Sequence, residues 1–221
     1  MTEFIQSAVV VGATGLVGKA LVACLHAEPS IKAIRVIVRS EAAEFLAYDK
    51  LEQVVVPDFM HINAEHMQGF SHLFSCLGST LKKAGSKTNF YHIDYEMNAH
   101  IVDILKMQKM HYVVVSAEGA NVHSAFFYNR VKGQLESYIQ HADLYRVSIL
   151  RPSLLLGERA DSRLLEDVSK RCIQKLLPFL PKQFSFKPVT AEQVAHTMVS
   201  VAQFQNNQFE IYDNLKIQQS K

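Results

Sequence analysis

The stretch that decides the fold is Ala8-Val9-Val10-Val11-Gly12-Ala13-Thr14-Gly15-Leu16-Val17-Gly18. A run of β-branched residues leads into three glycines spaced three residues apart, and residues 16–27, which suit a helix, follow directly. Gly12 suits a tight turn because a glycine takes a positive φ without a steric penalty. The pattern therefore predicts a strand, a turn and a helix, with Gly18 allowing the helix to pack closely on the strand.

A turn of this kind is suited to a dinucleotide. Backbone amides can approach a pyrophosphate where Gly15 carries no side chain, and a helix N-terminus offers free N–H groups and a positive dipole end. The same residues could also form a glycine-rich turn with no ligand. Because the motif lies between a predicted strand and a predicted helix, we favour a dinucleotide site. We expect its contacts to come from Gly12, Thr14, Gly15, Leu16, Val17 and Gly18.

The rest of the chain alternates apolar strand-like runs with amphipathic helices. Further strands are expected at residues 33–38, 54–56, 73–77, 111–115, 147–150 and 209–212, and further helices at residues 89–110, 126–141, 160–177 and 191–204. Thr190 is the expected N-cap of the last helix, with Gln193 completing a capping box. Helices between successive strands imply parallel pairing through right-handed crossovers.

The predicted fold is α/β, a Rossmann-type doubly wound parallel sheet of six to seven strands with helices on both faces. We expect one dinucleotide-binding domain over residues 1–221, with a small substrate-site portion from about residue 153. In such sheets, ligands bind outside the carboxyl ends of the strands.

Composition indicates an ordinary globular protein. With 221 residues, the chain can bury a core without disulfides or metals. Its three cysteines, Cys24, Cys76 and Cys172, are far apart and are expected to be reduced thiols. The ten histidines lack metal-ligand spacing on one helix face, so we expect no metal site.

Charge and hydropathy guide the expected partners and location. The net charge of +2 gives no reason to expect nucleic acid or a membrane surface as a partner, and no apolar run reaches 18 residues. The N-terminus lacks the features of a signal peptide. We therefore predict a cytoplasmic protein that acts on a small molecule. A monomer and a homodimer both remain open.

The end of the second predicted strand indicates which dinucleotide binds. NAD-binding sheets place an acidic residue there, about 20 residues past the glycines, whereas an arginine accommodates the 2′-phosphate of NADP. Here the strand is followed by Arg39, whose guanidinium can bind a phosphate with two hydrogen bonds. Glu41 could bind the ribose instead if the strand ends later, and Arg39 could be an ordinary solvated residue. We favour NADP over NAD.

The candidate for chemistry is the pair Tyr128 and Lys132. Residues four apart share a helix face, and a neighbouring cation favours the phenolate form of a tyrosine. Such a tyrosine can pass a proton to or from a carbonyl or alcohol oxygen. Tyr212 and Lys216 have the same spacing, but they lie in the tail, far in sequence from the glycine turn. Position therefore favours Tyr128.

Four motifs, spread over most of the chain, point to one known family. The chain resembles a short-chain dehydrogenase/reductase of the atypical kind, and is most similar to the Tat-interacting-protein group and its bacterial relatives. The motifs are residues 12–18, Cys76-Leu77-Gly78-Ser79-Thr80 with Lys83-Ala84-Gly85, Tyr128 to Lys132 followed by Gly133, and Arg151-Pro152-Ser153-Leu154-Leu155-Leu156.

The resemblance implies a set of site roles. The glycine turn would hold the NADP pyrophosphate, and the Arg39 position the 2′-phosphate. Tyr128 would be the proton donor or acceptor, and Lys132 would hold the nicotinamide ribose and tune Tyr128. The remaining cofactor contacts that it implies are Cys76, Leu77 and Gly78 after the fourth strand, backbone around Leu155 facing the nicotinamide, and Arg163 reaching the cofactor phosphates.

The chain departs from the family pattern in three places. The family places a serine, often the second of a Ser-Ser pair, after the fifth strand to polarise the substrate oxygen, and here Ala117 follows Ser116. Ser116 serves, or Ser124 does, or the contact is reduced. Asp94 stands where longer relatives often carry an asparagine, so the usual proton relay does not transfer. The chain is also short after Pro152, which implies a small substrate site or inefficient catalysis.

The sequence thus predicts an NADP-dependent oxidoreductase acting on a small carbonyl or alcohol, with Tyr128, Lys132 and Ser116 as catalytic residues. A dinucleotide-binding regulator with little catalysis is one alternative. An epimerase-like enzyme that uses bound cofactor transiently is another.

Overall fold

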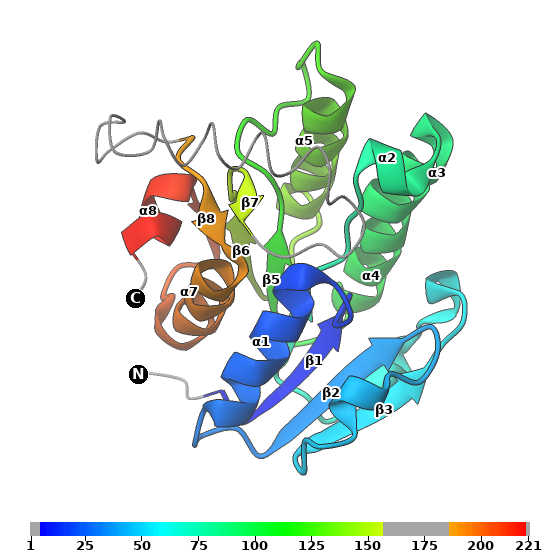
Figure 1. Cartoon of the computed structure of the whole chain (residues 1–221), viewed down its shortest axis with the longest axis vertical. Helices are drawn as coiled ribbons and strands as arrows, with labels where there is room; N and C mark the ends of the chain where they lie inside the picture. Colours follow the sequence, from blue (N-terminus) through cyan, green and yellow to red (C-terminus); the bar gives the residue numbers. More distant parts are fainter. Residues whose placement is uncertain (1–4, 157–185, 220–221) are drawn as a thin grey trace.

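Seven strands form one parallel sheet in this computed structural model, which describes residues 5–156 and 186–219 (Figure 1). Their order is β3-β2-β1-β4-β5-β6-β9, a Rossmann-like arrangement that confirms the predicted fold class. The strands are β1 (Ser7–Val11), β2 (Ala33–Val38), β3 (Leu51–Val55), β4 (His72–Ser75), β5 (His111–Val115), β6 (Arg146–Leu150) and β9 (Phe209–Tyr212). A separate short parallel pair, β7 (Leu155–Leu156) with β8 (Val189–Thr190), was not predicted.

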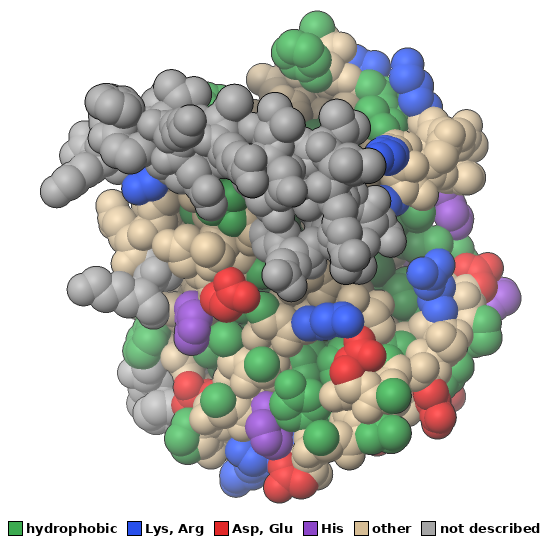
Figure 2. Space-filling view, in the orientation of Figure 1, with side chains coloured by type: hydrophobic (Ala, Val, Ile, Leu, Met, Phe, Trp, Pro, Cys, Tyr) green, Lys and Arg blue, Asp and Glu red, His purple; other side chains and the backbone are tan. Residues whose placement is uncertain are grey.

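Helices cover both faces of the sheet. Figure 1 shows α1 (Leu16–Ala27) and α7 (Ala191–Phe204) side by side on one face, while α4 (Met97–Leu105) and α5 (Phe127–Gln140) lie on the other. The shorter helices are α2 (Leu81–Ala84), α3 (Lys87–Tyr91) and α8 (Asn214–Gln219), and 3-10 turns cover Ala43–Phe45, Phe59–His61 and Ala64–Met67. Within the described ranges, no helix is both long and apolar enough to cross a bilayer. Figure 2 shows side chains of both charge signs intermixed on the face that α1 forms.

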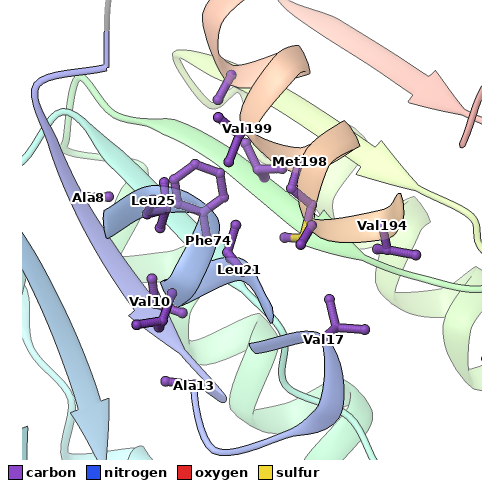
Figure 3. Packing of buried hydrophobic residues seen from close by; sticks show 14 of the residues in the cluster. Ala8, Val10, Ala13, Val17, Leu21, Leu25, Phe74, Val194, Met198 and Val199 are labelled. Carbon is purple, nitrogen blue, oxygen red and sulfur yellow. The ribbon is translucent and has the colours of Figure 1, made fainter. Parts of the chain in front are cut away.

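The core is divided by the sheet because successive strand residues point to opposite faces. Ala8 and Val10 of β1 pack with Leu21 of α1 and Met198 of α7 (Figure 3), whereas Val9 packs on the α4 and α5 side. The predicted capping box begins α7, with the Thr190 hydroxyl accepting from Gln193 N at 3.2 Å.

The sheet order places the candidate site at the carboxyl ends of β1 and β4, where the direction of strand progression reverses. Val11 pairs with Ile37 of β2 on one side and Ser75 of β4 on the other. Gly12 follows with a φ of +77°, and a Cβ there would lie 2.6 Å from the backbone carbon of Cys76. Only glycine fits between these two strand ends.

Some predicted boundaries were wrong. The helix expected at residues 89–110 consists of α3, a π-helical segment (His92–Glu96) and α4, and α4 ends at Leu105. Apolar spacing does not distinguish a π turn from α-helical turns, and the exposed Met107 marks where burial has ended. The fourth strand ends at Ser75, two residues early, because the chain turns away there to form the site. The helix expected at residues 160–177 lies outside the described residues, as do Arg163 and Cys172.

Two buried histidines at the amino ends of β4 and β5 lead to a prediction about acid stability. His72 and His111 are register partners on β4 and β5, with ring centroids 5.5 Å apart. Burial, reinforced by His72 and Arg146, lowers the pKa of His111 from 6.5 to about 3. As pH falls below about 6.5, the unfolded chain therefore binds a proton that the folded chain excludes, and stability declines until about pH 3.

Replacing His111 with glutamine is expected to remove this part of the pH dependence. Between about pH 7 and pH 5, the wild type should lose about 2 kcal/mol more unfolding free energy than His111→Gln. Urea unfolding of both proteins at the two pH values measures the difference. Equal losses would show that the pKa of His111 is the same in the folded and unfolded chains.

Candidate active site

One cavity of about 400 Å³ joins the glycine turn to the N-terminal half of α5. It brings together residues that are distant in sequence, as the sheet topology requires. Its walls are formed by Thr14, Gly15, Leu16, Val17, Lys19, Cys76, Leu77, Gly78, Ser79, Thr80, Lys83, Asp94, Val115, Ser116, Tyr128, Lys132, Pro152, Ser153 and Leu155. Most of the predicted site residues are therefore neighbours. Among the described residues that were predicted, Gly12, Gly18 and Arg39 lie outside these walls.

The glycines of the turn have different structural roles. A Cβ on Gly18 would lie 2.2 Å from the Gly12 carbonyl oxygen, so Gly18 allows α1 to pack on the turn. Gly15 has an ordinary φ of −75°, and a Cβ there would have one close neighbour, the same oxygen at 3.3 Å. Gly15 is also the N-cap residue of α1, which has no side-chain cap, and its own N–H donates to the Gly12 carbonyl oxygen at 3.1 Å. The N–H groups of the first turn of α1 follow it, and such groups at a helix N-terminus fit a pyrophosphate.

Arg39 lies at the same edge of the sheet as the glycine turn. It follows β2 by one residue, and β2 pairs with β1 through Ile37 and Val11. The side chain is exposed and is separate from the cavity walls. Nearer the turn, Lys19 lies on the wall and pairs with Glu44 at 2.8 Å.

Tyr128 and Lys132 reach the cavity from the first two turns of α5. Tyr128 is partly buried, with its ring 5.4 Å from that of Phe90, and Lys132 is buried. Gly133 lets the preceding loop pack on α5, because a Cβ there would lie 2.3 Å from the backbone of Asn121.

The second pair with the same spacing is placed elsewhere. The Tyr212 hydroxyl donates to Glu210 at 2.6 Å, and the Lys216 ammonium lies 5.0 Å from the centre of the Tyr212 ring. Neither residue lines the cavity that holds Tyr128.

A buried carboxylate that the sequence did not assign to the site lies beside Lys132. Asp94, on the π-helical segment, places Oδ1 2.7 Å from the Lys132 ammonium, and its Oδ2 accepts from Ser79 N at 2.8 Å. Burial alone would lower the pKa of Lys132, but its interactions with Asp94, and to a smaller extent with Tyr128 and Glu136, outweigh burial and raise that pKa. One feature of the sequence could have indicated this contact: Asp94 and Asn98 are polar residues four positions apart within the amphipathic segment. Both are fully buried in the structure.

Ser116 lines the cavity, and its hydroxyl is hydrogen-bonded to a second ion pair, Glu136 with Arg151. Its Oγ donates to the Glu136 carboxylate, which also accepts from Arg151 Nε at 3.0 and 3.1 Å. The neighbouring Ala117 is buried away from the wall, and the Ser124 hydroxyl accepts from Phe126 N. Of the serines considered from the sequence, the structure places Ser116 in the cavity.

The predicted Cys76 contact is a free thiol on the cavity wall. Burial raises the pKa of Cys76 to about 12, and its Sγ lies 4.0 Å from the Met198 sulfur. The thiolate is the reactive form of cysteine, and a thiol with so high a pKa stays protonated at neutral pH. We therefore assign Cys76 a packing role.

Comparison with known proteins defines the class. Residues 12–205 match the model of the NAD(P)H-binding family. The chain belongs to this family. The solved structure of a UDP-N-acetylglucosamine 4-epimerase from Methanobrevibacter ruminantium has the same fold, with a TM-score of 0.70, 16% identity, and coverage of 96% of this chain and 77% of the epimerase.

Two relatives define the group more closely. The chain is 34% identical to Protein FMP52-1 of Scheffersomyces stipitis over 203 residues, which cover 90% of this chain and 88% of that protein. It is 32% identical to Protein HTATIP2 of Rattus norvegicus, over 72% of this chain and 66% of that protein. The chain is therefore an atypical short-chain dehydrogenase/reductase of the HTATIP2 group, as the sequence motifs predicted.

The relatives contradict the predicted location. FMP52-1 and the FMP52 proteins of Debaryomyces hansenii, Candida albicans and Saccharomyces cerevisiae are all labelled mitochondrial. The prediction of a cytoplasmic protein was therefore wrong. It rested on the absence of a secretory signal, which does not report on other routes of targeting.

Proposed function

We propose that this protein is an NADP-dependent oxidoreductase that transfers a hydride to or from a small carbonyl or alcohol. The observation that carries the proposal is that one cavity is lined both by Gly15, where no side chain covers the backbone, and by Tyr128 and Lys132. Cofactor binding and proton transfer can therefore occur side by side.

Each group has a role that follows from its place. When bound, the reduced nicotinamide supplies a hydride to the substrate's carbonyl carbon. Tyr128 donates the proton that completes the alcohol, or accepts it in the reverse direction. Lys132 directs its ammonium to the cofactor ribose and to Tyr128, and Ser116 contacts the substrate oxygen. At about 400 Å³, the cavity holds the nicotinamide end of a cofactor and a small substrate.

NADPH is expected to bind at least about tenfold more tightly than NADH. Arg39 is exposed at the strand end beside the glycine turn, and charge-assisted hydrogen bonds contribute about 1.5–3 kcal/mol. Arg39→Ala should weaken NADPH binding and leave NADH binding almost unchanged. Fluorescence titration with both nucleotides measures this. Equal affinities in the wild type, or an unchanged NADPH affinity in the variant, would contradict the preference.

One observation favours a second candidate function. The hydroxyl proton of Ser116 is directed to Glu136, which leaves fewer groups to polarise a substrate oxygen. A dinucleotide-binding regulator with little catalysis would need the glycine turn and Arg39, but it would not need a free serine proton. Measurement of NADPH oxidation in the presence of small aldehydes and ketones separates the two functions.

A further inference from the structure

The Asp94 carboxylate is held from two sides. Its Oδ1 lies 2.7 Å from the Lys132 ammonium on α5, and its Oδ2 accepts from Ser79 N at 2.8 Å in the loop after β4. A Cβ on Gly78 would lie 3.1 Å from Oδ1 and 3.4 Å from the ammonium, so the backbone also packs against the pair. Asp94 and Lys132 are 0% and 3% exposed, and the pair is thus fixed in place inside the protein.

Burial makes this pair different from an ion pair at the surface. A buried ammonium without a partner is costly, and such a lysine generally loses its proton instead. Among the described residues, Asp94 is the one carboxylate in ion-pair contact with Lys132. Tyr128 and the buried Glu136, both on α5, also favour the charged ammonium, but less strongly than Asp94. An ammonium has three donors, and Lys132 lies on the cavity wall beside Asp94, so the same ammonium can serve both the carboxylate and a ligand in the cavity.

We propose that Asp94 is the counter-ion and positioning residue of Lys132, which holds the ammonium charged and directs its remaining donors into the cavity. An asparagine at this position would be neutral, so it would leave the buried ammonium without a counter-ion. The role of Lys132 in turnover rests on the proposed function. The charge state of Lys132 is independent of the proposed function, so the test measures that charge directly and needs no substrate.

The test is an NMR pH titration of the lysine side-chain ε-carbons in the full-length protein. The Lys132 signal is assigned by its loss in Lys132→Arg. In the wild type, we expect Lys132 to stay protonated to above the ordinary range for lysine. In Asp94→Asn, the midpoint should fall by about two pH units or more, because the buried charge has lost its partner.

Asp103→Asn is the matched control. Asp103 lies 2.6 Å from Lys106, but both side chains are largely exposed, so the same change removes a surface ion pair from the helical region that also carries Asp94. It should leave the Lys132 midpoint where it is in the wild type. An unchanged Lys132 midpoint in folded Asp94→Asn would overturn the proposal.

A double variant covers the case in which Asp94→Asn does not fold. Asp94→Asn with Lys132→Met removes both charges, so it should be folded and should unfold at a higher temperature than Asp94→Asn. A double variant no more stable than Asp94→Asn would show that Asp94 serves something other than Lys132. The two proposals can fail separately. If the Lys132 midpoint falls in Asp94→Asn as expected, but the wild type reduces no carbonyl compound, the proposed function fails and the assignment of Asp94 stands.

Discussion

Tyr128→Phe is expected to lower turnover of any carbonyl substrate by a factor of about 10²–10⁴, the usual contribution of a general acid or base. The substitution removes the hydroxyl and keeps the ring, whose contact with Phe90 at 5.4 Å should survive. The loss should therefore fall on the chemical step, with NADPH affinity almost unchanged. Steady-state rates and an NADPH titration on the same variant measure both quantities.

Two controls sharpen this result. Tyr212→Phe removes the hydroxyl of the other tyrosine that has a lysine four residues on, and it should keep full turnover because Tyr212 lies outside the cavity. Lys132→Ala should lose cofactor affinity as well as rate, since Lys132 serves both the ribose and Tyr128. Full turnover in Tyr128→Phe would mean that the proton comes from elsewhere and that Tyr128 is a packing residue.

The second large effect is expected at Gly15. Gly15→Val should abolish NADPH binding while the fold is kept, because the new side chain fills the space proposed for the pyrophosphate. The φ of −75° at Gly15 is ordinary for any L residue, and a Cβ there has one close neighbour, the Gly12 carbonyl oxygen at 3.3 Å, which needs to move by only a few tenths of an ångström. Calorimetric titration with NADPH gives the affinity, and thermal unfolding reports on the fold.

Gly18→Val provides the contrast within the same motif. Its Cβ would lie 2.2 Å from the Gly12 carbonyl oxygen, so the turn and α1 would have to separate, and we expect a large loss of stability. Normal NADPH binding by Gly15→Val would contradict the assignment of the turn to the pyrophosphate. Equal stability of the two valine variants would contradict the different roles given to the two glycines.

The fold could be predicted from the sequence because its signals are local. The glycine turn, the alternation of apolar runs with helices and the capping box at Thr190 each lie within a few residues, and each was confirmed. Helices between successive strands imply parallel pairing, which the sheet shows, while the strand order itself comes from the structure. The boundaries in error, such as the end of the fourth strand, are places where tertiary contacts override local pattern.

The charged contacts of the site could not be predicted in the same way. Asp94 and Lys132 are 38 positions apart, and their contact depends on a π turn that apolar periodicity does not reveal. Ser116, Glu136 and Arg151 come from a loop after β5, from α5 and from a residue after β6, so their hydrogen bonds exist only once the sheet has formed. Sequence motifs thus located the residues of the cavity, and the structure gave their partners.

The most direct test of the central claim is the rate of NADPH oxidation by the purified wild type with a panel of small aldehydes and ketones. At least one of these compounds is expected to be reduced, with NADPH consumed and the alcohol formed in equal amounts. Tight NADPH binding without oxidation above the rate of the protein-free mixture, for every compound, would contradict the oxidoreductase and favour the regulator.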